Sequence, residues 1–77
     1  MEQKIKQDKI FIGQNIRRIR KERGIRQTEM VALMQLQNVY VTREALVKIE
    51  TGIQHIQASQ LRAIRNVLKT TYDELLK

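Results

Sequence analysis

The chain has 77 residues, with 15 Lys or Arg against 8 Asp or Glu and a formal net charge of +7. This length corresponds to one domain, close to the lower limit for a core that is stable without staples. Because there is no cysteine, disulfides and thiolate metal sites are excluded, and the one histidine, His55, cannot form a metal site alone. The excess of positive charge favours a polyanionic partner, with nucleic acid first and an anionic membrane surface second.

The first eight residues are polar and charged, and we expect residues 1–8 to form a flexible tail. They lack the apolar stretch of a secretory signal. No apolar run approaches the roughly 20 residues that a membrane-spanning helix needs. These features predict a protein that stays in the cytoplasm, and the absence of cysteine is compatible with that location.

The rest of the chain is expected to be mostly helical, because it has no proline and three glycines. A first helix is predicted over residues 9–23, where Ile12, Ile16 and Ile19 form one apolar stripe. Gly24 is suited to end it in a left-handed conformation. Phe11 is expected to extend the stripe or to cover its end.

A second helix is predicted over residues 27–36, with Met30, Leu33 and Met34 on one face and a weakly marked start at Arg26. The following segment, "QNVYVT", is rich in β-formers and is expected to be a loop with apolar side chains beneath it.

A third helix is predicted over residues 42–51, with Thr42 as N-cap and Gly52 beyond its end. After a connector, "IQHIQ", a fourth helix is expected over residues 58–69. A short fifth helix should follow the capping box of Thr71 and Glu74. The predicted fold is all-α, a compact bundle of about five short helices over residues 9–77.

Three stretches together carry a resemblance to a known family: "IGQNIRRIRKERGIRQTEM", "TREALVKIETG" and "LRAIRNVLKTTYDELL". They resemble helix-turn-helix regulators of the Cro and lambda-repressor type, also called the xenobiotic-response-element family. The resemblance covers about residues 12–76 and implies that the third predicted helix enters the major groove of DNA. The extended connection "LQNVYV" is similar to a long-loop variant, in which apolar residues matching Val39 and Val41 fill the gap.

The chain also departs from the family pattern. Val31 and Arg65 stand where the family often has alanine, so Arg65 must find a partner or extend towards solvent. Ile53 and Gln54 follow the glycine of the third helix, where basic residues often contact phosphate in this family. These departures affect the expected phosphate affinity more than the fold.

The resemblance and the chemistry of the major groove together assign roles to the third predicted helix. Arg43 is suited to guanine, Glu44 to cytosine, and Ala45 or Val47 to the methyl group of thymine. The ordinary alternative is that these residues form the solvated face of a surface helix. Phosphate contacts are expected from six residues, namely Arg17, Arg26, Gln27, Thr42, Lys48 and Thr51.

By the same resemblance, Arg20 and Glu50 are expected to form a partly buried ion pair that fixes the angle of the third helix. Two independent surface charges are the alternative. Arg18, Lys21 and Arg23 add positive charge to the first helix and its C-terminal end. Two or three of the basic residues in and after this helix are expected to reach phosphate.

Enzymatic chemistry has no support in the sequence, because nucleophile–base pairs, glycine-rich phosphate loops and metal clusters are missing. No cofactor is expected. The predicted function is a sequence-specific regulator of transcription that binds double-stranded DNA, a repressor acting as a homodimer on a palindromic operator. The alternative is a protein-interaction module, similar to an antirepressor or antitoxin partner, with little or no affinity for DNA. A basic amphipathic membrane binder is a weaker third hypothesis.

Overall fold

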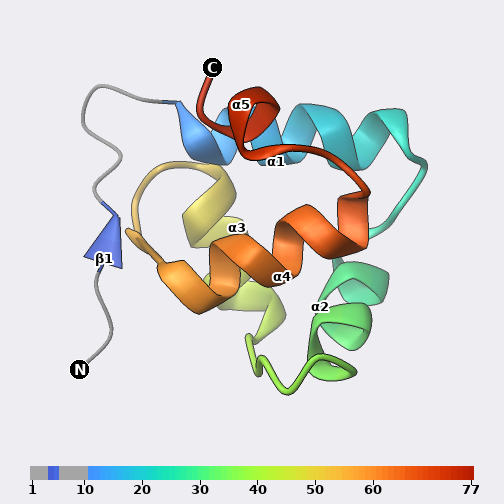
Figure 1. The fold of residues 1–77 in the computed structure, drawn as a ribbon. Helices are drawn as coiled ribbons and strands as arrows, with labels where there is room; N and C mark the ends of the chain where they lie inside the picture. The colour runs from blue at the N-terminus through green and yellow to red at the C-terminus, as the bar shows by residue number, and fades with distance from the viewer. Residues whose placement is uncertain (1–3, 6–10) are drawn as a thin grey trace.

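The computed structural model describes residues 4–5 and 11–77. The elements follow one another as β1 (Lys4–Ile5), α1 (Ile12–Glu22), α2 (Gln27–Gln35), α3 (Arg43–Glu50), β2 (Ile56–Gln57), α4 (Ala58–Leu68) and α5 (Tyr72–Leu75). In Figure 1, α4 crosses the middle of the molecule in front of α3, α2 lies beside them, and α5 rests against α1. This arrangement confirms the predicted all-α bundle of short helices.

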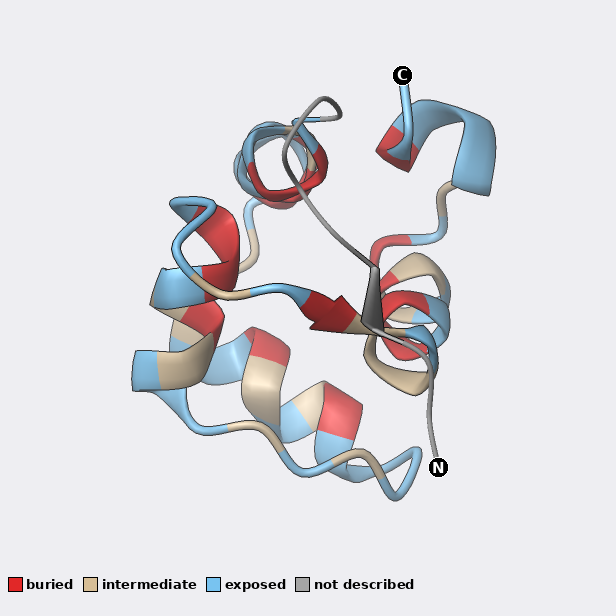
Figure 2. Ribbon diagram, turned by 90° about the vertical axis from the view of Figure 1, so that its left-hand side faces the viewer, coloured by how far each residue is buried: buried red, intermediate tan, exposed pale blue. Residues whose placement is uncertain are grey.

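One hydrophobic core lies between the helices, and each helix contributes to it. Figure 2 shows the buried residues on the inward sides of the helices. The isoleucine stripe predicted for the first helix is part of this core. Its buried hydrophobic residues are Ile12, Ile16, Ile19, Met30, Met34, Leu46, Ile49, Ile56, Leu61, Ala63, Ile64, Leu68 and Leu75.

Two apolar residues lie differently from the prediction. Leu33 is half-buried and outside the core, because the face of α2 that packs inward carries Met30 and Met34. Phe11 does not cover the end of the isoleucine stripe, since 62% of it is exposed to solvent.

The helix ends follow the residues that the sequence offers. The hydroxyl of Thr42 accepts a hydrogen bond from the Ala45 amide at 3.1 Å, and that of Thr71 accepts one from the Glu74 amide at 3.2 Å. Gly24 and Gly52 adopt φ angles of 69° and 83°, which a left-handed helix end requires. α2 lacks a side-chain N-cap at Arg26.

Short β structure is the main difference from the all-helical prediction. β1 and β2 pair antiparallel, with Lys4 opposite Gln57 and Ile5 opposite Ile56. The predicted connector therefore ends in a strand, and its Ile56 enters the core. Of the predicted tail, residues 1–3 and 6–8 lie outside the described residues, as do residues 9–10 of the predicted first helix.

Residues 36–42 connect α2 to α3 by a longer route than a short helix-turn-helix turn. Val39 and Val41 are half-buried and pack against the core beneath this loop. The Val39 amide donates to the Met34 carbonyl at 3.2 Å, and Asn38 adopts a φ of 61°. The loop is thus tied to the end of α2 and sets the position at which α3 begins.

α1 and α3 approach each other closely at Gly13. A Cβ atom on this residue would overlap the carbonyl oxygen of Ile49 and would lie 2.8 Å from that of Glu50. Only a residue without a side chain permits this contact. The beginning of α1 is therefore held directly against the end of α3.

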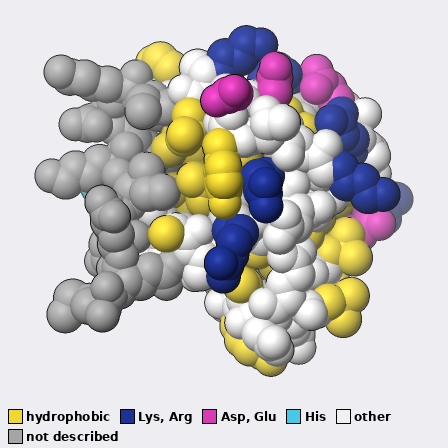
Figure 3. All heavy atoms as spheres, in the orientation of Figure 1, with side chains coloured by type: hydrophobic (Ala, Val, Ile, Leu, Met, Phe, Trp, Pro, Cys, Tyr) yellow, Lys and Arg dark blue, Asp and Glu magenta, His cyan; other side chains and the backbone are white. Residues whose placement is uncertain are grey.

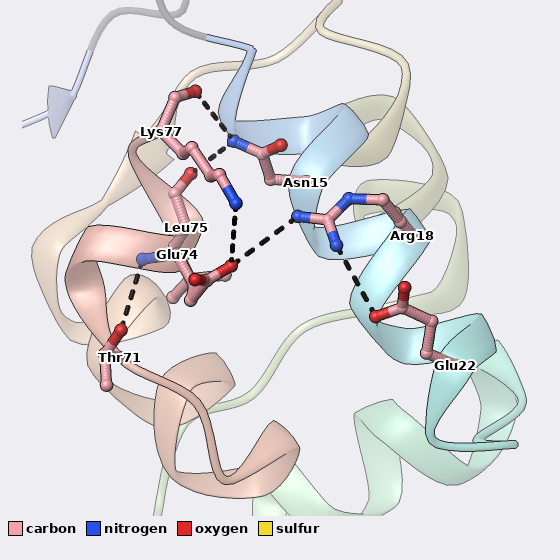
Figure 4. A network of polar contacts seen from close by, with 7 residues as sticks. All are labelled: Asn15, Arg18, Glu22, Thr71, Glu74, Leu75 and Lys77. Carbon is pink, nitrogen blue, oxygen red and sulfur yellow. Dashed lines mark hydrogen bonds and ion pairs between the residues drawn. The ribbon is translucent and has the colours of Figure 1, made fainter.

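At the other side of α1, polar contacts hold the C-terminal segment (Figure 4). The side-chain amide of Asn15 donates to the main-chain oxygens of Leu75 at 2.9 Å and Lys77 at 3.2 Å. Arg18 lies 3.5 Å from the Glu22 carboxylate and 4.0 Å from that of Glu74. These contacts fix α5 on α1.

Candidate nucleic-acid interface

A groove lies between α1, the beginning of α2 and α3. It consists of two adjoining hollows of about 810 and 540 Å³, which share Arg17, Lys21, Gln27 and Arg43. The first hollow is also lined by Gln14, Arg18, Val47, Glu50 and Thr51, and the second by Arg20, Arg26 and Thr28. We call these two hollows together the basic groove.

The spacing of residues in α1 explains its part in the groove. Gln14, Arg17, Arg18 and Lys21 recur at intervals of three and four, so they share one face of the helix. The isoleucine stripe occupies the opposite, buried face. α1 thus packs into the core on one side and presents basic side chains on the other.

A buried carboxylate connects the three segments that form the groove through hydrogen bonds. Glu50, 2% exposed, accepts hydrogen bonds from Arg20 Nε at 2.7 Å and Arg20 Nη2 at 3.0 Å. Gln27 Nε2 donates to the same carboxylate at 3.2 Å. Arg20 Nη1 also donates to the Ile25 carbonyl at 2.8 Å, in the connection between α1 and α2. The ends of α1 and α3 and the start of α2 are therefore fixed relative to one another.

The exposed charge of the basic groove is positive. Arg17, Lys21, Arg26 and Arg43 are exposed, and among the described residues none of them has a carboxylate within ion-pair distance. The one acidic residue lining the groove, Glu50, is occupied by Arg20. The N-terminus of α2 adds the partial positive charge of a helix start. These groups make the groove suited to an anion with several charges.

Another face of the molecule is different in character. Figure 3 shows the side that carries α4 and α5, where acidic, basic and hydrophobic side chains are interspersed. Most of the acidic groups visible there lie along the edge at α5, which contains Asp73 and Glu74. This side carries exposed charges of both signs, whereas the exposed charges that line the basic groove are positive.

The structure distributes the predicted base-reading residues unequally. Arg43 and Val47 line the basic groove, whereas Ala45 is half-buried and Glu44 is exposed outside the described hollows. Lys48 lies on the other flank of α3, in a hollow of about 450 Å³ that it shares with Ile53, Gln54 and His55.

The predicted phosphate-binding residues also separate into groups. Arg17, Arg26 and Gln27 lie together in the basic groove. Thr51 borders the groove, and its hydroxyl donates to the Val47 carbonyl at 2.9 Å. The hydroxyl of Thr42 serves as the N-cap of α3 and lies beside a different hollow.

Some basic residues have structural partners instead. Arg23 donates from Nε to the Leu68 carbonyl at 3.0 Å, at the end of α4. Arg65 lies 4.7 Å from the centre of the Tyr72 ring and donates to Asn66 at 2.9 Å, so it extends across the surface of α4 and α5. Arg18 lines the groove but is shared with Glu22 and Glu74.

Gln14 and Thr28 line the groove but were not among the predicted site residues. For Gln14, the position one turn before Arg17 and Arg18 on the polar face of α1 was a usable signal. Within the described residues, no group of three or more His, Cys, Asp or Glu could hold a metal ion. None of the described helices has the length and apolar character needed to cross a membrane.

Comparison with known protein families matches residues 16–75 to a helix-turn-helix family. No curated protein and no solved structure matches the chain. The matched region runs from the middle of α1 to the end of α5 and includes α2, α3 and most of the basic groove. The chain therefore belongs to the helix-turn-helix family of the Cro and lambda-repressor type, a family of DNA-binding regulators.

Proposed function

We propose that the protein is a sequence-specific regulator of transcription, a repressor that acts in the cytoplasm and inserts α3 into the major groove of double-stranded DNA. The observation that carries this proposal is the basic groove. Four exposed cations, Arg17, Lys21, Arg26 and Arg43, surround Gln27 at the start of α2, and the acidic residue of the groove is neutralised internally. DNA phosphates are the polyanion that fits such a surface beside a short exposed helix.

Within this proposal the side chains divide into two tasks. Arg43, at the first position of α3, lines the groove and would read guanine, while Val47, one turn later, would contact a thymine methyl group. Arg17, Arg26 and Gln27 would bind phosphates of one strand, and Lys48 on the opposite flank would reach the other strand. Glu44 would accept from cytosine or orient Arg43.

In this proposal, Gln27 links DNA binding to the internal network. Its side-chain nitrogen donates to Glu50 at 3.2 Å, and an amide nitrogen carries a second hydrogen that remains for a phosphate oxygen. Since the residue opens α2, the backbone amides of the first turn lack partners within the helix and would be available to the same phosphate. A phosphate held there would fix the distance between the DNA backbone and α3.

A homodimer on a palindromic operator completes the proposal. One recognition helix reads only a few base pairs, so a two-fold pair of helices provides useful specificity. The exposed Tyr72 and Leu76 near the C-terminus, or Tyr40 in the loop before α3, supply apolar surface for such a contact.

The experiment that tests this function is selection from a random pool of duplex DNA at low and at near-physiological salt. Enrichment of a palindrome at both salt concentrations is the expected result. Binding without sequence preference that disappears at the higher salt would contradict the proposal, because phosphate contacts alone behave in this way.

One alternative has a specific observation in its favour. Glu44 is exposed on α3, and Ile53 and Gln54 follow Gly52 where basic residues would strengthen phosphate binding. A protein-interaction module, similar to an antirepressor or antitoxin partner, would tolerate these features better than a DNA-binding domain. Absence of DNA binding at low salt would favour this alternative.

A further inference from the structure

Phe11 stands at a position where two local preferences are broken. It is the N-cap residue of α1, where Ser, Thr, Asn or Asp would satisfy a free amide, and it makes no side-chain cap hydrogen bond. It is also a large aromatic side chain that is 62% exposed. Residues that violate local rules without a structural gain are expected at functional sites.

The surroundings of Phe11 connect it to the basic groove. A hollow of about 210 Å³ is lined by Phe11, Gln14, Thr51 and Gly52. Gln14 and Thr51 also line the first hollow of the basic groove, so the two hollows adjoin where α1 begins and α3 ends. In contrast to the basic groove, this small hollow is lined by uncharged residues.

The position of Phe11 relative to α3 is fixed by backbone contacts. Its carbonyl accepts the Asn15 amide at 3.0 Å, which begins the hydrogen bonding of α1. Two residues later, Gly13 lies against the carbonyls of Ile49 and Glu50. The ring is therefore attached to a rigid junction between α1 and the end of α3.

We infer that Phe11 is an additional DNA-contacting residue, whose ring packs against a deoxyribose of the backbone at the outer end of the basic groove. The inference rests on the proposed function. A DNA strand alternates phosphates with sugars, and sugar contacts help to position a protein on the duplex. The cations of the basic groove suit the phosphates, whereas the uncharged hollow beside Phe11 suits the C–H face of a neighbouring sugar. Arg43 and Val47 read bases earlier along α3, so Phe11 contributes affinity and not sequence preference.

The test uses the full chain with Phe11→Ser and Phe11→Tyr, and with Leu36→Ser as a matched control. Leu36 is 80% exposed, follows α2 and lines none of the described hollows. Dissociation constants are measured for the selected duplex and an unrelated duplex over a salt series, together with the thermal midpoint of each variant.

Phe11→Ser is expected to weaken binding to both duplexes by roughly five-fold, because an apolar contact is lost. The slope of log K against log salt should not change, since no phosphate contact is removed. The thermal midpoint should be equal or higher, because serine supplies the missing N-cap. Phe11→Tyr should retain the affinity, and Leu36→Ser should leave it unchanged.

Three results would overturn the inference: unchanged affinity of Phe11→Ser, weakening confined to the selected duplex, or an altered salt slope. Loss of self-association at constant DNA affinity would assign Phe11 to a second copy of the chain and would also overturn it. Arg17→Gln separates this inference from the proposed function. If Arg17→Gln reduces the salt slope while Phe11→Ser has no effect, only the inference on Phe11 fails. If the unaltered chain shows no salt-dependent DNA binding, both fail.

Discussion

Replacing Gly13 by alanine should destabilise the protein, although glycine to alanine within a helix usually stabilises. The usual gain is about 0.5–1 kcal/mol, because alanine has the higher helix propensity. Here the new Cβ would overlap the Ile49 carbonyl oxygen and lie 2.8 and 2.9 Å from the carbonyl oxygen and carbon of Glu50. These are main-chain atoms of α3, which cannot rotate away as a side chain could. α1 would have to move away from α3.

The expected size of the effect follows from two opposing contributions. Forcing an additional carbon into a packed contact costs about 1–3 kcal/mol, and a clash with backbone lies at the upper end of this range. The gain in helix propensity offsets no more than about 1 kcal/mol. The net loss is about 2 kcal/mol, which lowers the thermal midpoint of a domain of this size by about 8–16 °C.

Urea and thermal unfolding followed by far-ultraviolet circular dichroism measure this loss. The matched control is Gln14→Ala, the next residue of α1, which is exposed and should change stability by less than about 0.5 kcal/mol. DNA affinity should also decrease for Gly13→Ala, because Arg17 and Lys21 move with α1. A Gly13→Ala protein as stable as the unaltered chain would refute the close approach of α1 and α3.

Four further substitutions test other parts of the structure. Thr42→Ala removes the N-cap bond to α3 and should cost about 1 kcal/mol in urea unfolding; no loss would show that the cap is unimportant. Glu50→Ala leaves Arg20 buried without its partner and should cost about 3–5 kcal/mol by the same measurement, whereas replacing both by apolar residues should cost less. Arg17→Gln should lower the salt slope of DNA binding by about 0.9 per protomer in fluorescence titrations, and an unchanged slope would remove Arg17 from the phosphate contacts. Arg43→Ala should relax base preference at one operator position at a cost of about 1–3 kcal/mol; selection of an unchanged sequence would assign base reading elsewhere.

The helices were predictable because their determinants are local. The isoleucines of α1 recur with helical spacing, and all three are buried. Thr42 caps α3, and Gly24 and Gly52 adopt the left-handed conformation that their positions predict. Each of these features depends on residues within one or two turns, so the sequence contains the full physical cause.

Features that depend on distant residues were not predictable in the same way. The pairing of Lys4–Ile5 with Ile56–Gln57 joins segments more than fifty residues apart, and neither segment has a pattern long enough to indicate a strand. Gly13 has no local signal either, because the need for glycine comes from the carbonyls of α3. The exposure of Phe11 follows from the path of the chain at that junction, which apolar character alone does not determine.

For the candidate site, the sequence indicates which residues are basic, but the structure determines which of them share a surface. Arg17 and Arg23 lie less than two helical turns apart, yet Arg17 lines the basic groove and Arg23 binds the carbonyl of Leu68 at the end of α4. An α-helix turns by about 100° per residue, so the side chains of Arg17 and Arg23 point in different directions. Arg23 also lies at the C-cap of α1, where the helix ends. A count of positive residues therefore overestimates the cations available to DNA.

The buried carboxylate of Glu50 explains why such a groove can stay rigid in so small a domain. Pairing it with Arg20 contributes little net stability, because both charges must be removed from water. Its effect is geometric, since Arg20 also holds the Ile25 carbonyl and Gln27 donates to the same carboxylate. The helices that carry the cations of α1, the start of α2 and Arg43 of α3 are thereby held relative to one another before DNA binds. This preorganisation favours a partner with regularly spaced phosphates, because less conformational entropy is then lost when the partner binds.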